Sequence, residues 1–167
     1  VQGQTHGGYL KSQKGSLTEY AFDAVFDENA SQKYVYEKTT KPYLTNLLAG
    51  LNVTVFAYGA TGAGKTHTMM GSSRADDDVA GKADAGIIPN ALVDLFAMVE
   101  DKKASCKHGE EYSVLVSFIE VYNEQVYDLL ENSGKILQLR EDQEKGVVVV
   151  AGVTERIAEN PNAVLEC

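Results

Sequence analysis

Strand-like and helix-like segments alternate along this sequence, which predicts an α/β domain with a mixed central sheet and helices on both faces. Residues 53–58 are rich in β-branched and aromatic side chains and predict a buried strand. They lead directly into residues 59–66, which fit the pattern G-x-x-x-x-G-K-[ST], and residues 67–70 can continue as a helix. Strand, glycine-rich loop and helix in this order predict a P-loop NTPase.

The composition is typical of one domain with a hydrophobic core. Of the 167 residues, 44% are hydrophobic and 23% are charged. A net charge of −9 argues against nucleic acid as a partner. No apolar run approaches the roughly 20 residues of a membrane span, so no membrane partner is expected. Cys106 and Cys167 have no zinc or redox spacing, which predicts reduced thiols in a cytosolic protein.

Ahead of the glycine-rich loop, the sequence predicts a loop or weak hairpin, a strand and a helix. Residues 1–18 are rich in Gly, Ser, Gln and Lys, and residues 20–26 alternate like a strand. Ser31 is a suitable N-cap for the helix, and Gly50 suits its C-terminal end. Pro42 is expected to kink this helix or to restart it.

After the P-loop helix, residues 71–85 predict an acidic loop that includes Asp76, Asp77 and Asp78. We interpret this aspartate triplet as a solvated turn rather than a metal site. The run Gly86-Ile87-Ile88-Pro89 opens another helix, because proline is well tolerated in a first turn. One face of that helix is apolar and carries Ile88, Leu92, Leu95, Phe96 and Val99.

The last third of the chain predicts strands and two short helices. Residues 112–122 predict one long strand buried on both sides, and residues 123–130 predict a short helix. Residues 136–140 and 147–150 predict two strands around a charged turn at 141–146. Asn160-Pro161 predicts a helix start.

The loop's residue types point to phosphate binding. Gly59, Gly62 and Gly64 are expected to adopt positive φ and to let backbone N–H groups approach phosphate oxygens. Lys65 would place a cation on the β- and γ-phosphates, and the Thr66 hydroxyl would ligate Mg²⁺. Ala60, Thr61 and Ala63 would contribute mainly their backbone. A glycine-rich turn with a solvated lysine is the alternative, but strand, spacing and Lys-Thr all favour the phosphate site.

At this point the sequence resembles one family, the kinesin motor domain. The resemblance rests on several short motifs in the family's order, and the combination is far more specific than any one of them. They are Phe22-Asp23-Ala24-Val25-Phe26, the extended run from Phe56 to Met69, Gly86-Ile87-Ile88-Pro89, Glu120-Val121-Tyr122-Asn123-Glu124 and Asp128-Leu129-Leu130. Alanine at positions 60 and 63 resembles the class-eight kinesins, which walk toward microtubule plus ends.

The resemblance implies that residues 59–66 bind ATP, with Mg²⁺ at Thr66. It also implies that His67 packs on the adenine, although an ordinary helix-surface histidine is an equal alternative. The turn around Arg140 and Lys145 would face β-tubulin, or it is a plain solvated hairpin turn. The implied partner is the microtubule, with homodimerisation through segments outside these residues. The implied location is the cytoplasm and its microtubules, including the spindle or cilium.

The family's other nucleotide-site motifs are not in this sequence. Its R-x-R-P strand would precede residue 1, and both switch motifs and the neck linker would follow residue 167. Residues 1–167 are therefore expected to form part of a motor domain, the P-loop half. Alone, they are expected not to hydrolyse ATP at motor rates, because phosphoryl transfer depends on positioning by the switches. Unfilled sheet positions would leave apolar strand edges exposed.

Two other functions fit parts of this pattern. One is a non-motile, kinesin-derived structural or microtubule-associated protein that keeps the fold and its nucleotide site. The other is an unrelated P-loop NTPase such as a small GTPase, which the motifs between residues 71 and 130 disfavour. Glu120, Glu124 and Asp128 are interpreted as structural rather than as an acid/base pair.

Overall fold

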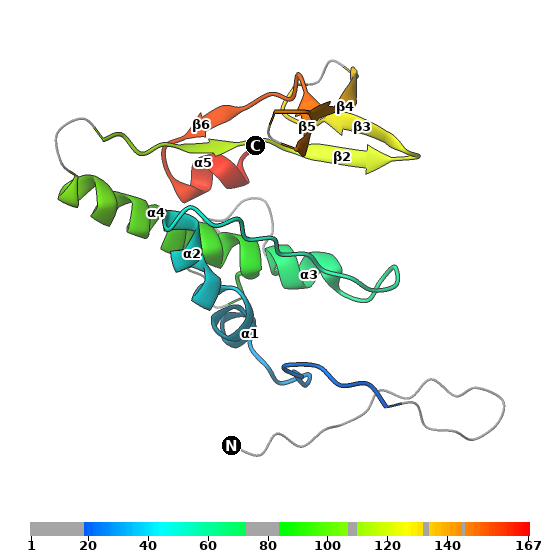
Figure 1. Ribbon diagram of the computed structural model, residues 1–167. Helices are drawn as coiled ribbons and strands as arrows, with labels where there is room; N and C mark the ends of the chain where they lie inside the picture. The colour runs from blue at the N-terminus through cyan, green and yellow to red at the C-terminus, as the bar shows by residue number, and fades with distance from the viewer. Residues whose placement is uncertain (1–18, 73–83, 107–109, 132–133, 145) are drawn as a thin grey trace.

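The computed structural model describes residues 19–72, 84–106, 110–131, 134–144 and 146–167. Helices occupy the first part of the chain and strands dominate the last part (Figure 1). In chain order the elements are α1 (Gln32–Thr39), η1 (Lys41–Tyr43), α2 (Leu44–Leu48), α3 (Lys65–Met70), α4 (Ile87–Ser105), β1 (Val114–Val116), β2 (Ile119–Tyr122), β3 (Gln125–Asp128), β4 (Ile136–Asp142), β5 (Val147–Ala151), β6 (Arg156–Ala158) and α5 (Pro161–Leu165).

The first helical segment follows its sequence signals closely. The Ser31 side chain accepts a hydrogen bond from the Tyr34 N–H at 3.2 Å and so caps α1, as predicted. Pro42 lies within the 3₁₀ turn η1, after which the chain continues as α2. The predicted restart at this proline is therefore confirmed, because proline has no N–H to extend α1.

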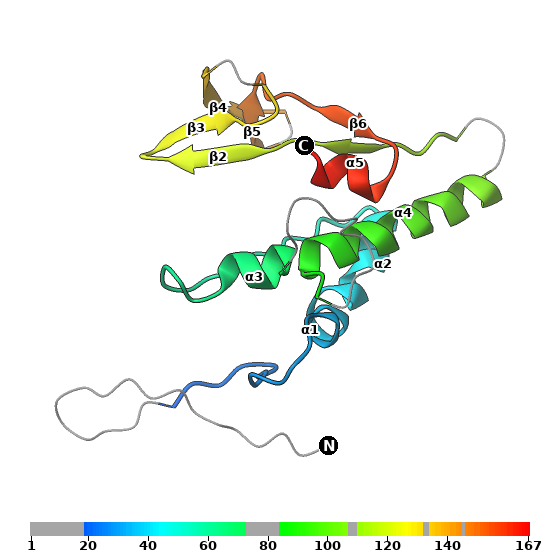
Figure 2. The same cartoon turned by 180° about the vertical axis from the view of Figure 1, so that it is seen from behind.

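Helix α4 lies at the centre of the molecule, with the strands on one side and α1 and α2 on the other (Figure 2). Its 19 residues begin at Ile87, with Pro89 in the first turn, as predicted. One buried cluster joins Ile87 to Tyr36 and Leu44. A second joins Phe96 to residues of β6 and α5. Of the predicted apolar face, Phe96 and Leu92 belong to the second cluster. The first cluster uses other α4 residues, Ile87, Ala91 and Met98, because α4 is covered on more than one side.

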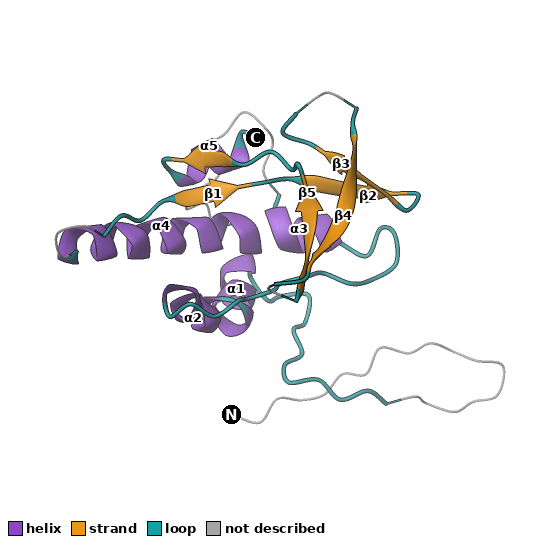
Figure 3. Ribbon diagram, turned by 45° about the horizontal axis from the view of Figure 1, so that its top comes forward, coloured by secondary structure: helices purple, strands orange, loops and turns teal. Residues whose placement is uncertain are grey.

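The strands form two small antiparallel sheets (Figure 3). In one, β1 pairs with β6. In the other, β2, β3, β4 and β5 follow one another as hairpins. The two strands predicted at 136–140 and 147–150 are confirmed as β4 and β5. Helix α5 is also confirmed, and the Asn160 side chain caps it by accepting from the Ala163 N–H at 2.9 Å.

The helix predicted at residues 123–130 is wrong. These residues form a two-residue turn and strand β3, which pairs with β2. Asn123 and Glu124 adopt positive φ angles of 49° and 62°. This left-handed pair is the geometry of a type I′ hairpin turn, whose twist matches the flanking strands. Asparagine tolerates that conformation, so Asn123 marked a hairpin rather than a helix.

The single long strand predicted at residues 112–122 is also wrong. It divides into β1 and β2, which belong to different sheets. Val114, Val116 and Phe118 are half-buried against the cluster around Phe96. The opposite face is open, and Val121 is 68% exposed. Burial on both sides is therefore incorrect, because Leu115 and Ile119 on the second face are exposed as well.

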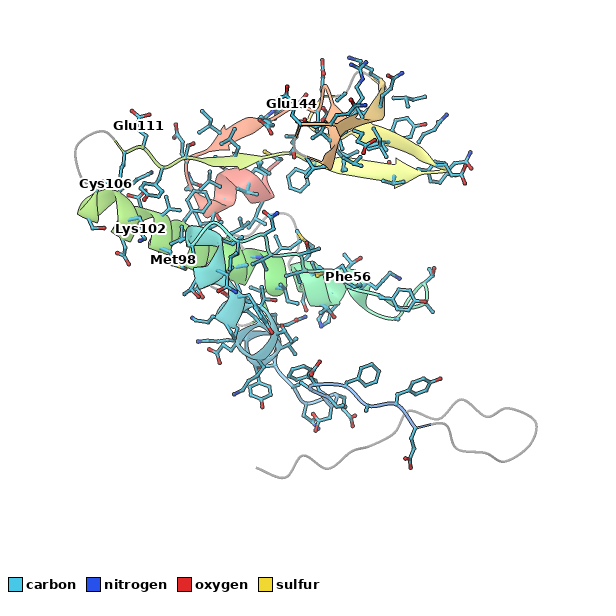
Figure 4. The ribbon with its side chains drawn as sticks, viewed as in Figure 1. Phe56, Met98, Lys102, Cys106, Glu111 and Glu144 are labelled. Carbon is cyan, nitrogen blue, oxygen red and sulfur yellow. The ribbon has the colours of Figure 1, made fainter. Side chains whose placement is uncertain are left out.

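The strands predicted at 20–26 and 53–58 have extended or irregular backbone without strand pairing. No partner strand lies beside either segment within the described residues. Without a neighbouring backbone to accept their hydrogen bonds, β-forming residues adopt no sheet. Their side chains are exposed, including Phe22 at 72% and Phe56 at 79% (Figure 4 labels Phe56). Apolar side chains are thus exposed as expected, but in segments that form no strand rather than along the edge of a sheet.

Candidate functional site

The glycine-rich loop connects the extended segment 51–58 to helix α3. Gly62 and Gly64 have φ angles of 81° and 92°, in the left-handed region that glycine adopts without strain. The loop closes with a hydrogen bond from the Ala63 N–H to the Ala60 carbonyl at 3.1 Å. Gly59 does not have positive φ, which corrects the prediction for that residue. An added Cβ at Gly59 would lie 3.2 Å from the Ala63 Cβ, a contact tight enough that Ala63 would have to shift slightly.

Lys65 is the first residue of α3, and its side chain folds back over the loop. Its Nζ donates hydrogen bonds to the Gly59 carbonyl at 3.0 Å and to the Ala60 carbonyl at 2.9 Å. These bonds hold a positive charge over the loop's backbone. The loop and the cation that the sequence predicted are therefore brought together.

The first turn of α3 can receive an anion. No side chain caps this helix, and Gly64 at its N-cap contributes only backbone. The first N–H groups of any helix lack intrahelical partners, and the helix dipole makes them attractive to negative charge. With Lys65 beside them, these groups have the charge and the free donors that phosphate oxygens need.

Thr66 and His67 follow Lys65 in α3, and both are exposed. The Thr66 hydroxyl is one oxygen of the kind that Mg²⁺ prefers, and such sites use few protein ligands with phosphate and water completing the shell. Within the described part of the chain, no group of three or more His, Cys, Asp or Glu residues is placed to hold a metal. The His67 Nδ1 lies 3.4 Å from the Ser72 Oγ, so its side chain faces the residue after the helix. Its contact with adenine stays a prediction.

Of the three acidic residues considered in the sequence, Glu120 lies on β2, Glu124 in the turn before β3, and Asp128 at the end of β3. Asp128 is buried and accepts hydrogen bonds from three backbone N–H groups, those of Thr154 at 2.7 Å, Leu130 at 2.9 Å and Glu131 at 3.3 Å. The bond from Thr154 contributes most to holding the pKa of Asp128 below its usual range, and burial opposes it. Asp128 is therefore structural, as predicted.

Several predicted features lie away from the loop or outside the described residues. Arg140 lies on β4, opposite Val149, and its guanidinium donates to the Gln138 Oε1 at 3.5 Å. The aspartates at 76–78 and Lys145 lie outside the described residues. Among the helices described, none is long and apolar enough to cross a bilayer.

Sequence reasoning missed the residues that hold α3 against the rest of the molecule. Gln32 donates from its Nε2 to the His67 carbonyl at 2.7 Å, which joins α1 to α3. Gly71 and Gly86 cross at the other end of α3. Both glycines stood at predicted element boundaries, so the signal was present, but their contact with each other was not readable from the sequence. Nothing in the sequence indicated the hydrogen bond of Gln32 to α3.

The site has the features of the P-loop class of nucleotide-binding proteins. These are a strongly turned glycine loop, a cation folded over it and an uncapped helix start. The family model for the kinesin motor domain matches residues 2–167. The chain therefore belongs to the kinesin motor domain family, whose members bind nucleotide and are microtubule-stimulated ATPases. The predicted family and its α/β P-loop fold are confirmed.

Individual relatives support this assignment. The chain is 50% identical to the kinesin-like protein KIF18A of Mus musculus over 131 residues, 78% of this chain and 13% of the relative. It is 40% identical to the kinesin-like protein KIF19 of Homo sapiens over 157 residues, 94% of this chain and 14% of the relative. A solved structure described as a fast kinesin has a TM-score of 0.77 and 35% identity, and the match covers 92% of this chain and 40% of that one. The chain thus spans about one seventh of these curated relatives.

Proposed function

We propose that this protein is an ATP-dependent microtubule motor that couples hydrolysis to movement on microtubules or to their remodelling. The observation that carries the proposal is the kinesin motor family match over residues 2–167, which includes an intact phosphate-binding loop. Residues 1–167 would form the P-loop half of the motor domain. The match to 40% of the fast-kinesin chain supports that share of the fold.

In this proposal the loop at Gly59–Thr66 holds the phosphates of ATP. The N–H groups at the start of α3 bind phosphate oxygens, and Lys65 exchanges its bonds to the Gly59 and Ala60 carbonyls for bonds to the β- and γ-phosphates. The exposed Thr66 hydroxyl would be the one ligand to Mg²⁺ from this loop. When bound, Mg²⁺ neutralises charge on the β- and γ-phosphates. The exposed His67 would pack on the adenine.

Partners and location follow from the same family. The protein would bind tubulin in microtubules, with the β4–β5 hairpin that carries Arg140 on the microtubule side. It would act in the cytoplasm, on the microtubule cytoskeleton of the spindle or cilium, and would form homodimers through other segments. Alanines at positions 60 and 63, together with the similarity to KIF18A, support a class-eight motor.

A non-motile, kinesin-derived structural protein is the second candidate. The intact Lys65 and Thr66 favour the motor, because a purely structural protein has no need of them. An unrelated GTPase is disfavoured by the family match.

The test is the microtubule-stimulated ATPase rate of the full-length protein and of its Lys65→Ala variant. We expect stimulation by microtubules in the parent and loss of at least 100-fold in Lys65→Ala, because charge on the transferred phosphoryl group would be uncompensated. Lys103→Ala is the matched control, since Lys103 pairs with the nearby Glu100 at the far end of α4. A parent protein that binds microtubules without any ATPase activity would favour the structural protein instead.

A further inference from the structure

Helix α3 ends where two glycine segments cross. Gly71, directly after the helix, has a φ of 93° and forms an antiparallel bridge with Ala85. On one side of the bridge the Gly86 N–H donates to the Met70 carbonyl at 3.2 Å. On the other side the Ser72 N–H donates to the Asp84 carbonyl, also at 3.2 Å. The last turn of α3 is therefore bonded directly to the residues that begin α4.

The two backbones touch so closely that neither glycine has room for a side chain. A Cβ on Gly86 would lie 2.6 Å from the Gly71 nitrogen and 2.6 Å from both carbonyl atoms of Met69. A Cβ on Gly71 would overlap the Asp84 carbonyl oxygen, and its φ would be strained for any other residue. Because all of these neighbours are backbone atoms, they cannot rotate away, and only a shift of α3 relative to α4 would relieve the contact.

The crossing is anchored on the α4 side. Ala85 is completely buried. The Asn90 side-chain amide donates to the Ala85 carbonyl at 2.7 Å and to the Gly86 carbonyl at 2.9 Å. Asn90 lies in the first turn and a half of α4, which is the longest helix and is held by both buried clusters. If a side chain is added at Gly71 or Gly86, α3 is therefore the element that moves.

A shift at the end of α3 reaches the phosphate-binding loop. The helix has six residues, so its last residue, Met70, lies only about 7.5 Å along the axis from Lys65 at its start. A helix this short moves as one piece, and Lys65 holds the loop through the Gly59 and Ala60 carbonyls. Misplacement of about 1 Å in a binding site can cost 100-fold in rate.

We propose that Gly71 and Gly86 are positioning residues for the nucleotide site. Their backbone crossing fixes the distance between α3 and α4, and through it the placement of Lys65 and the loop at residues 59–66. This inference rests on the proposed function, because it concerns how the same site holds nucleotide.

The experiment measures binding of a fluorescently labelled ADP with Mg²⁺ to the full-length protein, well below the melting temperature of each variant. We expect Gly86→Ala to weaken binding at least tenfold. The control is Gly50→Ala, because Gly50 has a φ of 84° and nothing within 4 Å of an added Cβ. That variant is expected to lower the melting temperature through backbone strain and to keep the dissociation constant within twofold of the parent.

A folded Gly86→Ala protein that binds within twofold of the parent would overturn the positioning role. If Gly86→Ala does not fold, Asn90→Ala tests the same crossing by removing the two hydrogen bonds that anchor it. We expect Asn90→Ala to weaken binding threefold or more, and unchanged binding would overturn the proposal. A parent protein that binds no labelled ADP would instead overturn the proposed function and, with it, the positioning role of the two glycines.

Discussion

The two flanks of the phosphate-binding loop differ in how they are held. On the helix side, α3 is bonded to α1 through Gln32 and to α4 through the crossing at Gly86. Met69 also packs against the cluster around Tyr36. On the strand side, residues 51–58 pair with no other strand in the described part of the chain. Tyr58, next to the loop, is 95% exposed.

This difference teaches that the loop takes its shape from local geometry and from the helix side. Gly62 and Gly64 turn the backbone, and Lys65 closes it over the Gly59 and Ala60 carbonyls. None of these features uses a strand partner. Substitutions test this comparison, and the largest effects are expected away from the strand side.

Removing the large side chain of Phe96 from α4 should have the greatest effect on stability. Phe96 is buried and packs against β6 and α5. Phe96→Ala is expected to lower the free energy of unfolding by about 3–5 kcal/mol, because it removes apolar contacts and leaves a cavity. Urea unfolding followed by circular dichroism measures it. A loss under about 1 kcal/mol would mean that the packing of α4 on β6 and α5 contributes little to stability.

Asp94 joins α4 to the first helical segment. It accepts from the buried Tyr36 hydroxyl at 2.6 Å and pairs with the Lys41 Nζ at 2.9 Å. Asp94→Ala is expected to cost about 1–3 kcal/mol of unfolding free energy, because the Tyr36 hydroxyl would remain buried without its acceptor. The same urea unfolding measures the loss. The control adds Tyr36→Phe to Asp94→Ala, so that the donor is removed together with its acceptor. An unchanged midpoint in Asp94→Ala would contradict this role.

This contribution should depend on pH in one direction. Burial raises the pKa of Asp94, but the hydrogen bonds from Tyr36 and Lys41 outweigh burial and hold the pKa below its usual range. A carboxyl with a lowered folded-state pKa stabilises the fold above its unfolded value of about 3.9, and the effect is lost as pH falls through the folded value. The stability difference between parent and Asp94→Asn should therefore be constant near pH 7 and shrink below about pH 4. A stability difference that grows as the pH falls would instead mean that the pKa of Asp94 is raised in the folded protein.

The cap of α1 tests a smaller contribution to the helix side. Ser31→Ala removes the acceptor for the Tyr34 N–H and should cost about 1 kcal/mol. Thermal unfolding measures this, and Ser31→Asp, which keeps a capping oxygen, should restore most of the loss. If alanine and aspartate give the same melting temperature, the cap contributes nothing.

The smallest effect is expected on the strand side. In a protein of residues 1–167, Phe56→Ala should change the unfolding free energy by no more than about 0.5 kcal/mol, since Phe56 is 79% exposed. The same substitution in the full-length protein should cost more, because the kinesin resemblance implies flanking strands. A large loss within residues 1–167 would show that this segment is packed after all.

Local signals in the sequence predicted the helical part well. Ser31, Pro42, Pro89 and Asn160 act through their own backbone or the next turn, so their effect does not depend on distant residues. The loop at residues 59–66 was predictable for the same reason. Its glycines and Lys65 contact one another within eight positions.

The errors lie where pairing decides the structure. Residues 53–58 have β-forming side chains, but a strand also needs a neighbour that the sequence does not reveal. The sequence predicts a helix at residues 123–130, whereas the left-handed Asn123 and Glu124 turn the chain into a hairpin. The crossing of Gly71 and Gly86 was missed because their contact joins residues 15 positions apart through backbone atoms alone.

Calorimetric titration of Mg-ATP into the nucleotide-free, full-length protein tests the central claim most directly. The account predicts one site that requires Mg²⁺, prefers ATP to GTP and is lost in Lys65→Ala but kept in Lys103→Ala. Equal binding by the parent and Lys65→Ala would contradict it, because the loop at residues 59–66 would then not hold the nucleotide.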